Sequence, residues 1–140
     1  MSKVAVVYWS GTGNTKLMAD AFAEGAKAKG AEVSVFTPGE FSAEKVAEFD
    51  AIAFGCPAMG AEVLEEGEFE PMFTAVEGSL KDKKIALFGS YDWGDGQWMR
   101  DWEARCKEDG AKMVQPGFIA NNTPGDDAIA ECSAIGGMLA

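Results

Sequence analysis

Three runs of almost unbroken apolar residues most constrain the fold of this chain. They cover residues 3–8, 51–56 and 84–89, and each is followed by a loop and then by a helical pattern. Strands this apolar are covered on both faces, as in parallel sheets flanked by helices. Residues 32–36 alternate polar and apolar side chains, which predicts a half-exposed outer strand. We expect a fifth strand at residues 112–120, at an edge of the sheet because Pro116 cannot donate to the ladder.

Apolar residues at helical spacing follow each of these strands. They predict helices after residue 16, after Ser42 as a capping residue, over residues 69–76, and around Trp98 and Ile129. Five strands that alternate with five helices predict an α/β fold, a doubly wound parallel sheet with helices on both faces. The chain has 140 residues, so we expect a single domain over residues 1–140.

Charge and hydropathy exclude several classes of function. The net charge of −11 argues against nucleic acid as a partner, since neutralising phosphates requires clustered Lys and Arg. An acidic chain suits a partner with a basic docking surface, or the charge serves solubility alone. No apolar run approaches the roughly 20 residues of a membrane span. The N-terminus also lacks the apolar stretch of a signal peptide.

The chain contains no histidine, which removes Ser-His and Cys-His nucleophiles and most zinc sites. Its three cysteines, Cys56, Cys106 and Cys132, lie far apart and form no C-x-x-C pair. We interpret them as buried thiols of a cytoplasmic protein and expect no metal site.

The loop after the first predicted strand consists of small and polar residues: Ser10-Gly11-Thr12-Gly13-Asn14-Thr15. Glycines permit tight turning, and hydroxyls, an amide and the N–H groups at a helix start can donate to phosphate oxygens. The loop lacks the third glycine of a dinucleotide site and the spacing of a P-loop. It contains no Lys or Arg, which favours a single phosphate monoester held by neutral donors. The alternative is a glycine-rich turn without a ligand.

Two further loops carry large apolar side chains outside any helical stripe. Met59 lies in Pro57-Ala58-Met59-Gly60, and Trp93 lies in Ser90-Tyr91-Asp92-Trp93-Gly94. A loop tryptophan is often only a packing lid. Two polarisable side chains at one sheet edge can instead clamp a flat ring from both faces. A planar ring system with one phosphate is flavin mononucleotide (FMN).

These three loops together resemble the cofactor loops of the flavodoxins, and the resemblance runs along almost the whole chain. The chain is similar to the short-chain type of clostridia and rumen anaerobes, because its last predicted strand carries no long inserted loop. The resemblance implies a five-stranded sheet in the order 2-1-3-4-5. It also implies a monomeric, low-potential one-electron carrier with non-covalently bound FMN, which shuttles between semiquinone and hydroquinone and exchanges electrons with redox proteins.

The resemblance also implies roles for individual residues. Ser10, Thr12, Asn14 and Thr15 would donate to the phosphate. Trp9 would shield it, unless Trp9 belongs to the core. Met59 would lie against the inner face of the ring and Trp93 over its outer face. The full set of expected FMN-binding residues is Trp9, Ser10, Gly11, Thr12, Gly13, Asn14, Thr15, Pro57, Ala58, Met59, Gly60, Ala61, Glu62, Ser90, Tyr91, Asp92, Trp93 and Gly94.

A redox switch is implied at Met59-Gly60-Ala61-Glu62. There the peptide after Gly60 would flip on reduction, and its carbonyl would accept a hydrogen bond from flavin N5. Glycine allows the positive φ that such a turn needs. Glu62 would accept a hydrogen bond from flavin N3, or it is one more solvated carboxylate.

Acidic side chains would surround the anionic hydroquinone and lower the potential at which it forms. They are Glu62, Glu65, Glu66, Asp92 and Asp95. Two positions depart from the family pattern. Asp92 stands where relatives often have glycine, and Ala61 stands where they often have Asp, Asn or Ser.

Two other functions fit the same fold class. An FMN-dependent NAD(P)H or quinone reductase needs open space over the flavin, where we expect Trp93. A flavin-free signalling domain needs an acidic phosphoacceptor cluster at a strand end, whereas the first strand ends in Tyr8-Trp9 and the third in Gly55-Cys56. We therefore expect an electron-transfer protein rather than an enzyme.

Overall fold

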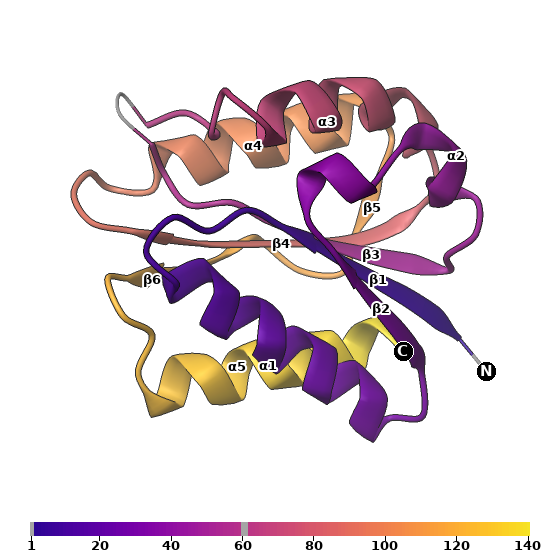
Figure 1. Cartoon of the computed structure of the whole chain (residues 1–140), viewed down its shortest axis with the longest axis horizontal. Helices are drawn as coiled ribbons and strands as arrows, with labels where there is room; N and C mark the ends of the chain where they lie inside the picture. The colour runs from indigo at the N-terminus through magenta and orange to yellow at the C-terminus, as the bar shows by residue number, and fades with distance from the viewer. Residues whose placement is uncertain (1, 60–61) are drawn as a thin grey trace.

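The computed structural model describes residues 2–59 and 62–140, which form a parallel sheet between two layers of helices (Figure 1). The sheet has the order β2-β1-β3-β4-β5, and β6 also pairs with β4. This is the expected strand order. The strands are β1 (Lys3–Tyr8), β2 (Glu32–Phe36), β3 (Ala51–Gly55), β4 (Lys84–Tyr91), β5 (Lys112–Met113) and β6 (Phe118–Asn121).

Two long helices cover one face of the sheet and three helices cover the other (Figure 1). The first pair is α1 (Asn14–Ala28) and α5 (Asp126–Leu139), and the second group is α2 (Ala43–Val46), α3 (Phe69–Val76) and α4 (Gln97–Glu108). Short 3-10 turns, η1 (Pro38–Glu40) and η2 (Glu77–Ser79), follow β2 and α3. Among the described residues, no helix combines the length and apolar character that crossing a membrane requires. Ser42 occupies the N-cap position of α2, as expected, but its side chain makes no capping hydrogen bond.

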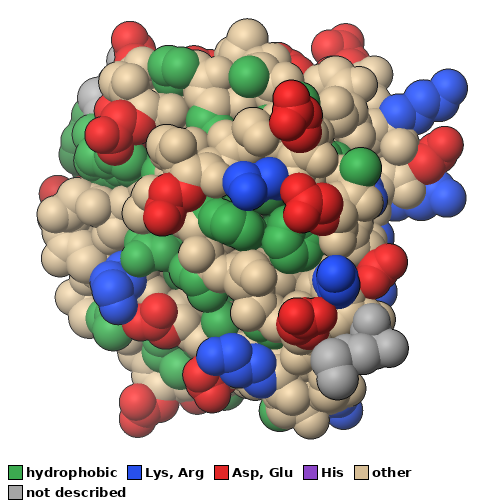
Figure 2. Space-filling view, turned by 45° about the vertical axis from the view of Figure 1, so that its right-hand side comes forward, with side chains coloured by type: hydrophobic (Ala, Val, Ile, Leu, Met, Phe, Trp, Pro, Cys, Tyr) green, Lys and Arg blue, Asp and Glu red, His purple; other side chains and the backbone are tan. Residues whose placement is uncertain are grey.

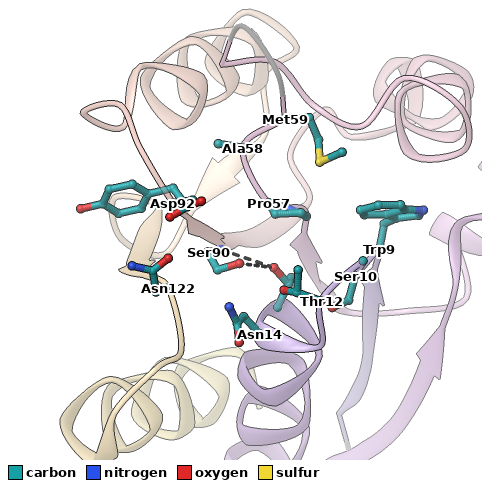
Figure 3. Close-up of a pocket in the computed structure, with 13 residues that line it drawn as sticks. Trp9, Ser10, Thr12, Asn14, Pro57, Ala58, Met59, Ser90, Asp92 and Asn122 are labelled. Atoms are coloured by element: carbon teal, nitrogen blue, oxygen red, sulfur yellow. Dashed lines mark hydrogen bonds between the residues drawn. The ribbon is translucent and has the colours of Figure 1, made fainter.

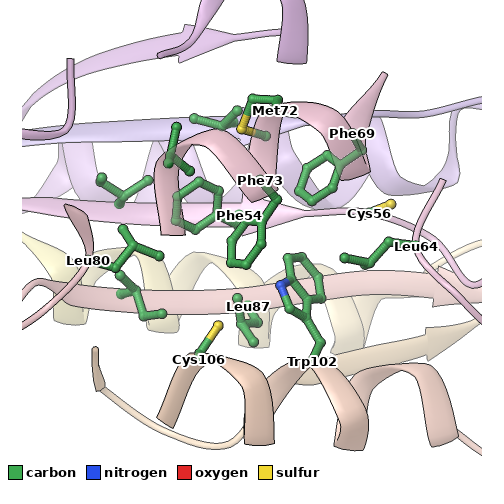
Figure 4. Close-up of a cluster of buried hydrophobic side chains, with 14 of the residues drawn as sticks. Phe54, Cys56, Leu64, Phe69, Met72, Phe73, Leu80, Leu87, Trp102 and Cys106 are labelled. Atoms are coloured by element: carbon green, nitrogen blue, oxygen red, sulfur yellow. The ribbon is translucent and has the colours of Figure 1, made fainter. Parts of the chain in front are cut away.

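The sheet is buried on both faces because its central strands are apolar throughout. Val4, Ala5, Val6 and Val7 of β1 are all fully buried, and they alternate between two clusters. The cluster beneath α3 and α4 is rich in aromatic rings (Figure 4). Trp102 packs edge-on against two phenylalanine rings there, with centroid distances of 5.5 Å to Phe69 and 5.7 Å to Phe73.

On the opposite face, α1 and α5 approach each other so closely that only glycine fits at two positions. A Cβ on Gly25 would lie 1.8 Å from the carbonyl oxygen of Ser133, and one on Gly136 would lie 2.1 Å from that of Phe22. This close packing fixes α1, whose N-terminus emerges at the carboxyl edge of the sheet.

The last strand was predicted at residues 112–120. The structure has strands in this region, but they are two short ones, β5 and β6, rather than one continuous strand. Met113 pairs with Ile85 and Phe118 pairs with Phe88, so four residues stand opposite two of β4. The four residues 114–117 bulge out between β5 and β6. Pro116 has no N–H for the ladder, and the N–H of Gly117 donates to the Glu103 carboxylate at 2.6 Å instead of to β4.

Candidate functional site

The loops after β1, β3 and β4 meet at the carboxyl edge of the sheet and are joined there by backbone hydrogen bonds. The N–H of Trp9 donates to Gly55 at 3.0 Å, that of Cys56 to Phe88 at 3.1 Å, and that of Ala58 to Ser90 at 3.1 Å. These bonds extend the ladder beyond the strands and hold the loops side by side. The edge of a parallel sheet where such loops gather is the usual position for a ligand.

A cavity of about 220 Å³ lies between these loops. Figure 3 shows the side chains that surround it, which come from all three loops and from the end of β6. Its walls are formed by Trp9, Ser10, Gly11, Thr12, Asn14, Thr15, Pro57, Ala58, Met59, Ser90, Tyr91, Asp92 and Asn122. Twelve of these thirteen residues were expected at the site from the sequence, and Asn122 was not.

The first loop turns tightly at the start of α1. Gly13 has a φ of 97°, a conformation that only glycine adopts at no steric cost. The Ser10 hydroxyl oxygen accepts the N–H groups of Gly13, at 3.0 Å, and Lys16, at 3.3 Å. The first turn of α1 contains no acidic residue. The positive end of the helix dipole therefore faces the cavity without a local counter-charge.

Ser90 connects all three loops at the floor of the cavity. Its hydroxyl lies 3.0 Å from that of Thr15, its N–H donates to the same Thr15 oxygen at 3.4 Å, and its carbonyl accepts from Ala58. Thr15 is 1% exposed and Ser90 is 5% exposed. Two hydroxyls this deeply buried in one cavity wall are costly unless both are paired. One hydroxyl proton is used in the bond between them, which leaves one O–H to donate to an anionic ligand.

Trp9 contacts both the core and the cavity. Its ring packs against the core cluster under α3, while the residue also lines the cavity. The indole N–H donates to the Glu68 carboxylate at 2.9 Å. A Cβ on Gly11 would lie 3.0 Å from the ring, so a glycine at position 11 leaves room for the indole. Trp9 therefore lies between the core and the cavity, and its shielding of the phosphate stays a prediction.

The second loop is closed by a pair of hydrogen bonds. The N–H of Met59 donates to Val63 at 2.9 Å, and that of Val63 donates to Met59 at 3.1 Å. The proposed switch residues Gly60 and Ala61, between them, lie outside the described residues. Glu62 has a φ of 56°, and its carboxylate accepts the N–H of Gln97 at 3.2 Å, at the start of α4.

The third loop contributes Tyr91 and Asp92 to the cavity wall, but not Trp93 or Gly94. Trp93 is 65% exposed, an unusual position for so large an apolar side chain. Gly94 has a φ of 97°, and a Cβ there would lie 2.6 Å from a Glu62 carboxylate oxygen. Of the other expected residues, Gly13 and Glu62 also lie outside the cavity wall.

Most of the acidic residues expected around the ligand have other partners. Partial burial alone would raise the pKa of Glu65. The carboxylate accepts three hydrogen bonds from the N–H groups of Gly67, Glu68 and Phe69, and together these outweigh burial, so the pKa is lowered. This carboxylate caps the start of α3. Asp95 pairs with Arg100 at 3.0 Å. Among the described residues, Asp92 is the one acidic side chain in the cavity wall.

Cysteine and metal chemistry find no support in the part of the chain that the structure describes. Burial raises the pKa of the Cys106 and Cys132 thiols to about 12, and that of Cys56 further still. Thiols held protonated in this way are poor nucleophiles and poor ligands. Within residues 2–59 and 62–140, no group of three or more acidic or cysteine side chains is arranged to hold a metal ion.

The donor set of the cavity suits a ligand with one phosphate and one flat apolar part. Neutral hydroxyl and N–H donors gather at the start of α1, which favours a phosphate. Pro57, Ala58 and Met59 form an apolar wall on the other side (Figure 3). FMN has both of these parts, so the residues present fit it.

Comparison with known proteins gives one family. The family model described as Flavodoxin matches residues 6–136. A flavodoxin of Clostridium beijerinckii is 43% identical over 135 residues, which are 96% of this chain and 97% of that protein. A flavodoxin of Megasphaera elsdenii is 44% identical over 133 residues, or 95% of each chain. The solution structure of the two-electron reduced Megasphaera elsdenii flavodoxin is similar with a TM-score of 0.87 at 44% identity, covering 96% of each chain.

Proposed function

The chain belongs to the flavodoxin family, and from this membership we propose how its three loops bind FMN and adjust its redox behaviour. Flavodoxins are electron-transfer proteins rather than enzymes, and this chain is an FMN-binding electron carrier that exchanges electrons with redox proteins. Bound FMN supplies the one-electron chemistry. The protein supplies the binding, the orientation and the charge that decide at which potential electrons are exchanged.

The first loop anchors the phosphate. The hydroxyls of Ser10, Thr12 and Thr15 and the N–H groups at the start of α1 are the donors, with Asn14 and Ser90 beside them. Ser10, Thr12, Asn14, Thr15 and Ser90 all line the cavity, which supports this assignment. A phosphate bound by neutral donors keeps its charge, and the helix dipole compensates part of it.

Met59 and Trp93 hold the ring. Met59 lines the cavity, and there it would lie against the inner face of the ring. The exposed indole of Trp93 covers the outer face once the ring is present, which would bury apolar surface that is now 65% exposed. Pro57, Ala58 and Tyr91 complete the wall beside the ring.

Asp92 makes the carrier strongly reducing. Asp92 lines the cavity and is exposed, so a negative charge on its side chain would repel the charge that full reduction adds to the flavin. Glu62 would hold the flavin by accepting a hydrogen bond from its N3–H, in place of its present partner, the N–H of Gln97. The peptide switch at Gly60 and Ala61 stays a prediction, and the two bonds between Met59 and Val63 would confine such a change to the residues between them.

A partner surface beside the cavity is supported by the acidic run of residues 62–70, which contains Glu62, Glu65, Glu66, Glu68 and Glu70. Figure 2 shows one face of the molecule, on which acidic and basic side chains are interspersed around apolar ones. We propose docking of a basic partner to a monomer near residues 62–70, with a rate that falls as salt rises. A cytoplasmic location is supported by three free, buried cysteines.

The observation that carries this function is the set of neutral donors around the buried Thr15–Ser90 pair. Titration of the flavin-free protein with FMN, followed by flavin fluorescence, should give one FMN per chain, with riboflavin bound more weakly because it lacks the phosphate. Equal affinity for the two flavins would contradict the assignment. The alternative, an NAD(P)H or quinone reductase, is tested in the same preparation, because rapid bleaching of the bound flavin by NADPH alone would favour it.

A further inference from the structure

Asn121 and Asn122, at the end of β6, form a fourth part of the site that the sequence did not point to. Asn121 stands opposite Tyr91 in the register of β4 and β6. Asn122 has a φ of 55°, a left-handed conformation that asparagine tolerates better than most residues. Its N–H donates to the carbonyl of Tyr91 at 2.7 Å. The end of β6 is therefore tied to the third cofactor loop.

The side chain of Asn121 uses all of its polar groups in this connection. Its amide nitrogen donates to the carbonyls of Tyr91, at 3.3 Å, and Asp92, at 3.2 Å. Its carbonyl oxygen accepts the side-chain amide of Asn122 at 3.0 Å. One amide group thus holds two consecutive carbonyls of the loop toward β6.

The orientation of these carbonyls fixes the N–H groups of the same peptides. In a planar trans peptide, the N–H points opposite to the carbonyl. The N–H groups of Asp92 and Trp93 are therefore turned away from β6. Within the described residues, neither N–H donates to another protein group. β4 lies between β3 and β6 in the sheet, so these two donors face the loop after β3, across the cavity.

We propose that Asn121 is a positioning residue, which holds the carbonyls of Tyr91 and Asp92 so that two backbone N–H groups face the carbonyl edge of bound flavin. This inference rests on the proposed FMN site. Donors at that edge gain most when the flavin becomes more electron-rich, because hydrogen bonds to charged acceptors are stronger. Asn121 therefore favours the fully reduced cofactor without touching it, and it offsets part of the repulsion from Asp92.

The test compares Asn121→Ala with Asn121→Gln, which keeps an amide donor, and with Thr123→Ala as a matched control. Thr123 is exposed, lies in the same turn and is absent from the cavity wall. Asn121→Ala should weaken binding of oxidised FMN by about two- to tenfold, the effect of one ordinary hydrogen bond. It should weaken binding of fully reduced FMN by a larger factor, and so make the second one-electron potential more negative. Asn121→Gln should recover part of both effects, and Thr123→Ala should show neither.

A second readout does not require the cofactor. In the flavin-free protein, the backbone ¹⁵N–¹H signals of Asp92 and Trp93 should shift in Asn121→Ala and keep their positions in Thr123→Ala. If these signals were unchanged, or if Asn121→Ala and the wild type had equal second one-electron potentials, the inference would be wrong and the proposed function would be unaffected. A wild type that binds no FMN would overturn the proposed function and this inference with it. The two failures are therefore distinguishable.

Discussion

Replacing Thr15 by valine removes one buried hydroxyl from the phosphate anchor while keeping the shape of the side chain. In the flavin-free protein, the Thr15 hydroxyl oxygen lies 3.0 Å from that of Ser90 and also accepts the Ser90 N–H at 3.4 Å. Thr15 is 1% exposed, so water compensates poorly for the lost group. Thr15→Val should lower the free energy of unfolding by about 1–3 kcal/mol, because Ser90 is left with unpaired buried groups.

The effect on cofactor binding should depend on the phosphate. A hydrogen bond to a charged group contributes about 1.5–3 kcal/mol. Since each 1.4 kcal/mol is about a factor of ten, Thr15→Val should weaken FMN binding by about 10- to 150-fold. Riboflavin has the same ring and no phosphate, so its dissociation constant should change by less than about threefold, the equivalent of a few tenths of a kcal/mol.

The assay is a fluorescence titration of wild type, Thr15→Val and the exposed control Thr123→Val with both flavins. Urea unfolding of the flavin-free proteins measures the stability change separately. If Thr15→Val weakened FMN and riboflavin by the same factor, the hydroxyl would act through the general shape of the site. The reasoning about a phosphate anchor would then be wrong.

Three further predictions concern charge and backbone strain. Asp92→Gly should raise the second one-electron potential by the equivalent of about 1 kcal/mol, most at low salt, and an unchanged potential in a redox titration at low salt would exclude the repulsion. Gly94→Ala should lower the free energy of unfolding by about 1–2 kcal/mol, because alanine is strained at the positive φ of this position. It should also displace the Glu62 carboxylate, which the added Cβ would meet at 2.6 Å. A urea unfolding midpoint equal to that of the wild type would contradict this prediction. Burial, and then the neighbouring Glu77 carboxylate, raises the pKa of Asp109 to about 6, so the wild type gives up stability as the pH rises from about 4 to about 6. Asp109→Asn should therefore raise the free energy of unfolding by about 1 kcal/mol at pH 7.5, a value discounted for partial exposure, and by almost nothing at pH 4. An equal gain at both pH values in urea unfolding would contradict the raised pKa of Asp109.

The parts of the fold that the sequence predicted are those fixed by local pattern. β2 and α3 have the expected bounds, and β1 has them too, because alternation and apolar runs report burial directly. The split of the last strand depends on a contact 14 residues away in sequence, between Gly117 and Glu103. A periodicity pattern carries no information on such a contact.

The candidate site shows the same division. Composition identified the loops, since small polar residues and isolated large side chains are local signals. It did not identify the partners of the acidic residues: Glu65 caps α3 and Asp95 pairs with Arg100, and both contacts depend on backbone geometry. Asn122 was missed because asparagines before a proline-containing turn are common. Only the hydrogen bond from its N–H to the Tyr91 carbonyl, at the end of β4, brings it to the cavity wall.

The most direct test of the central claim is a stepwise reduction of the FMN-bound protein, with absorbance and potential recorded together. A cavity that binds FMN beside Asp92 should separate the reduction into two resolved one-electron steps. The second should lie well below the corresponding potential of free FMN. A single two-electron step at the potential of free FMN would contradict the account, because the loops would then hold the cofactor without adjusting it.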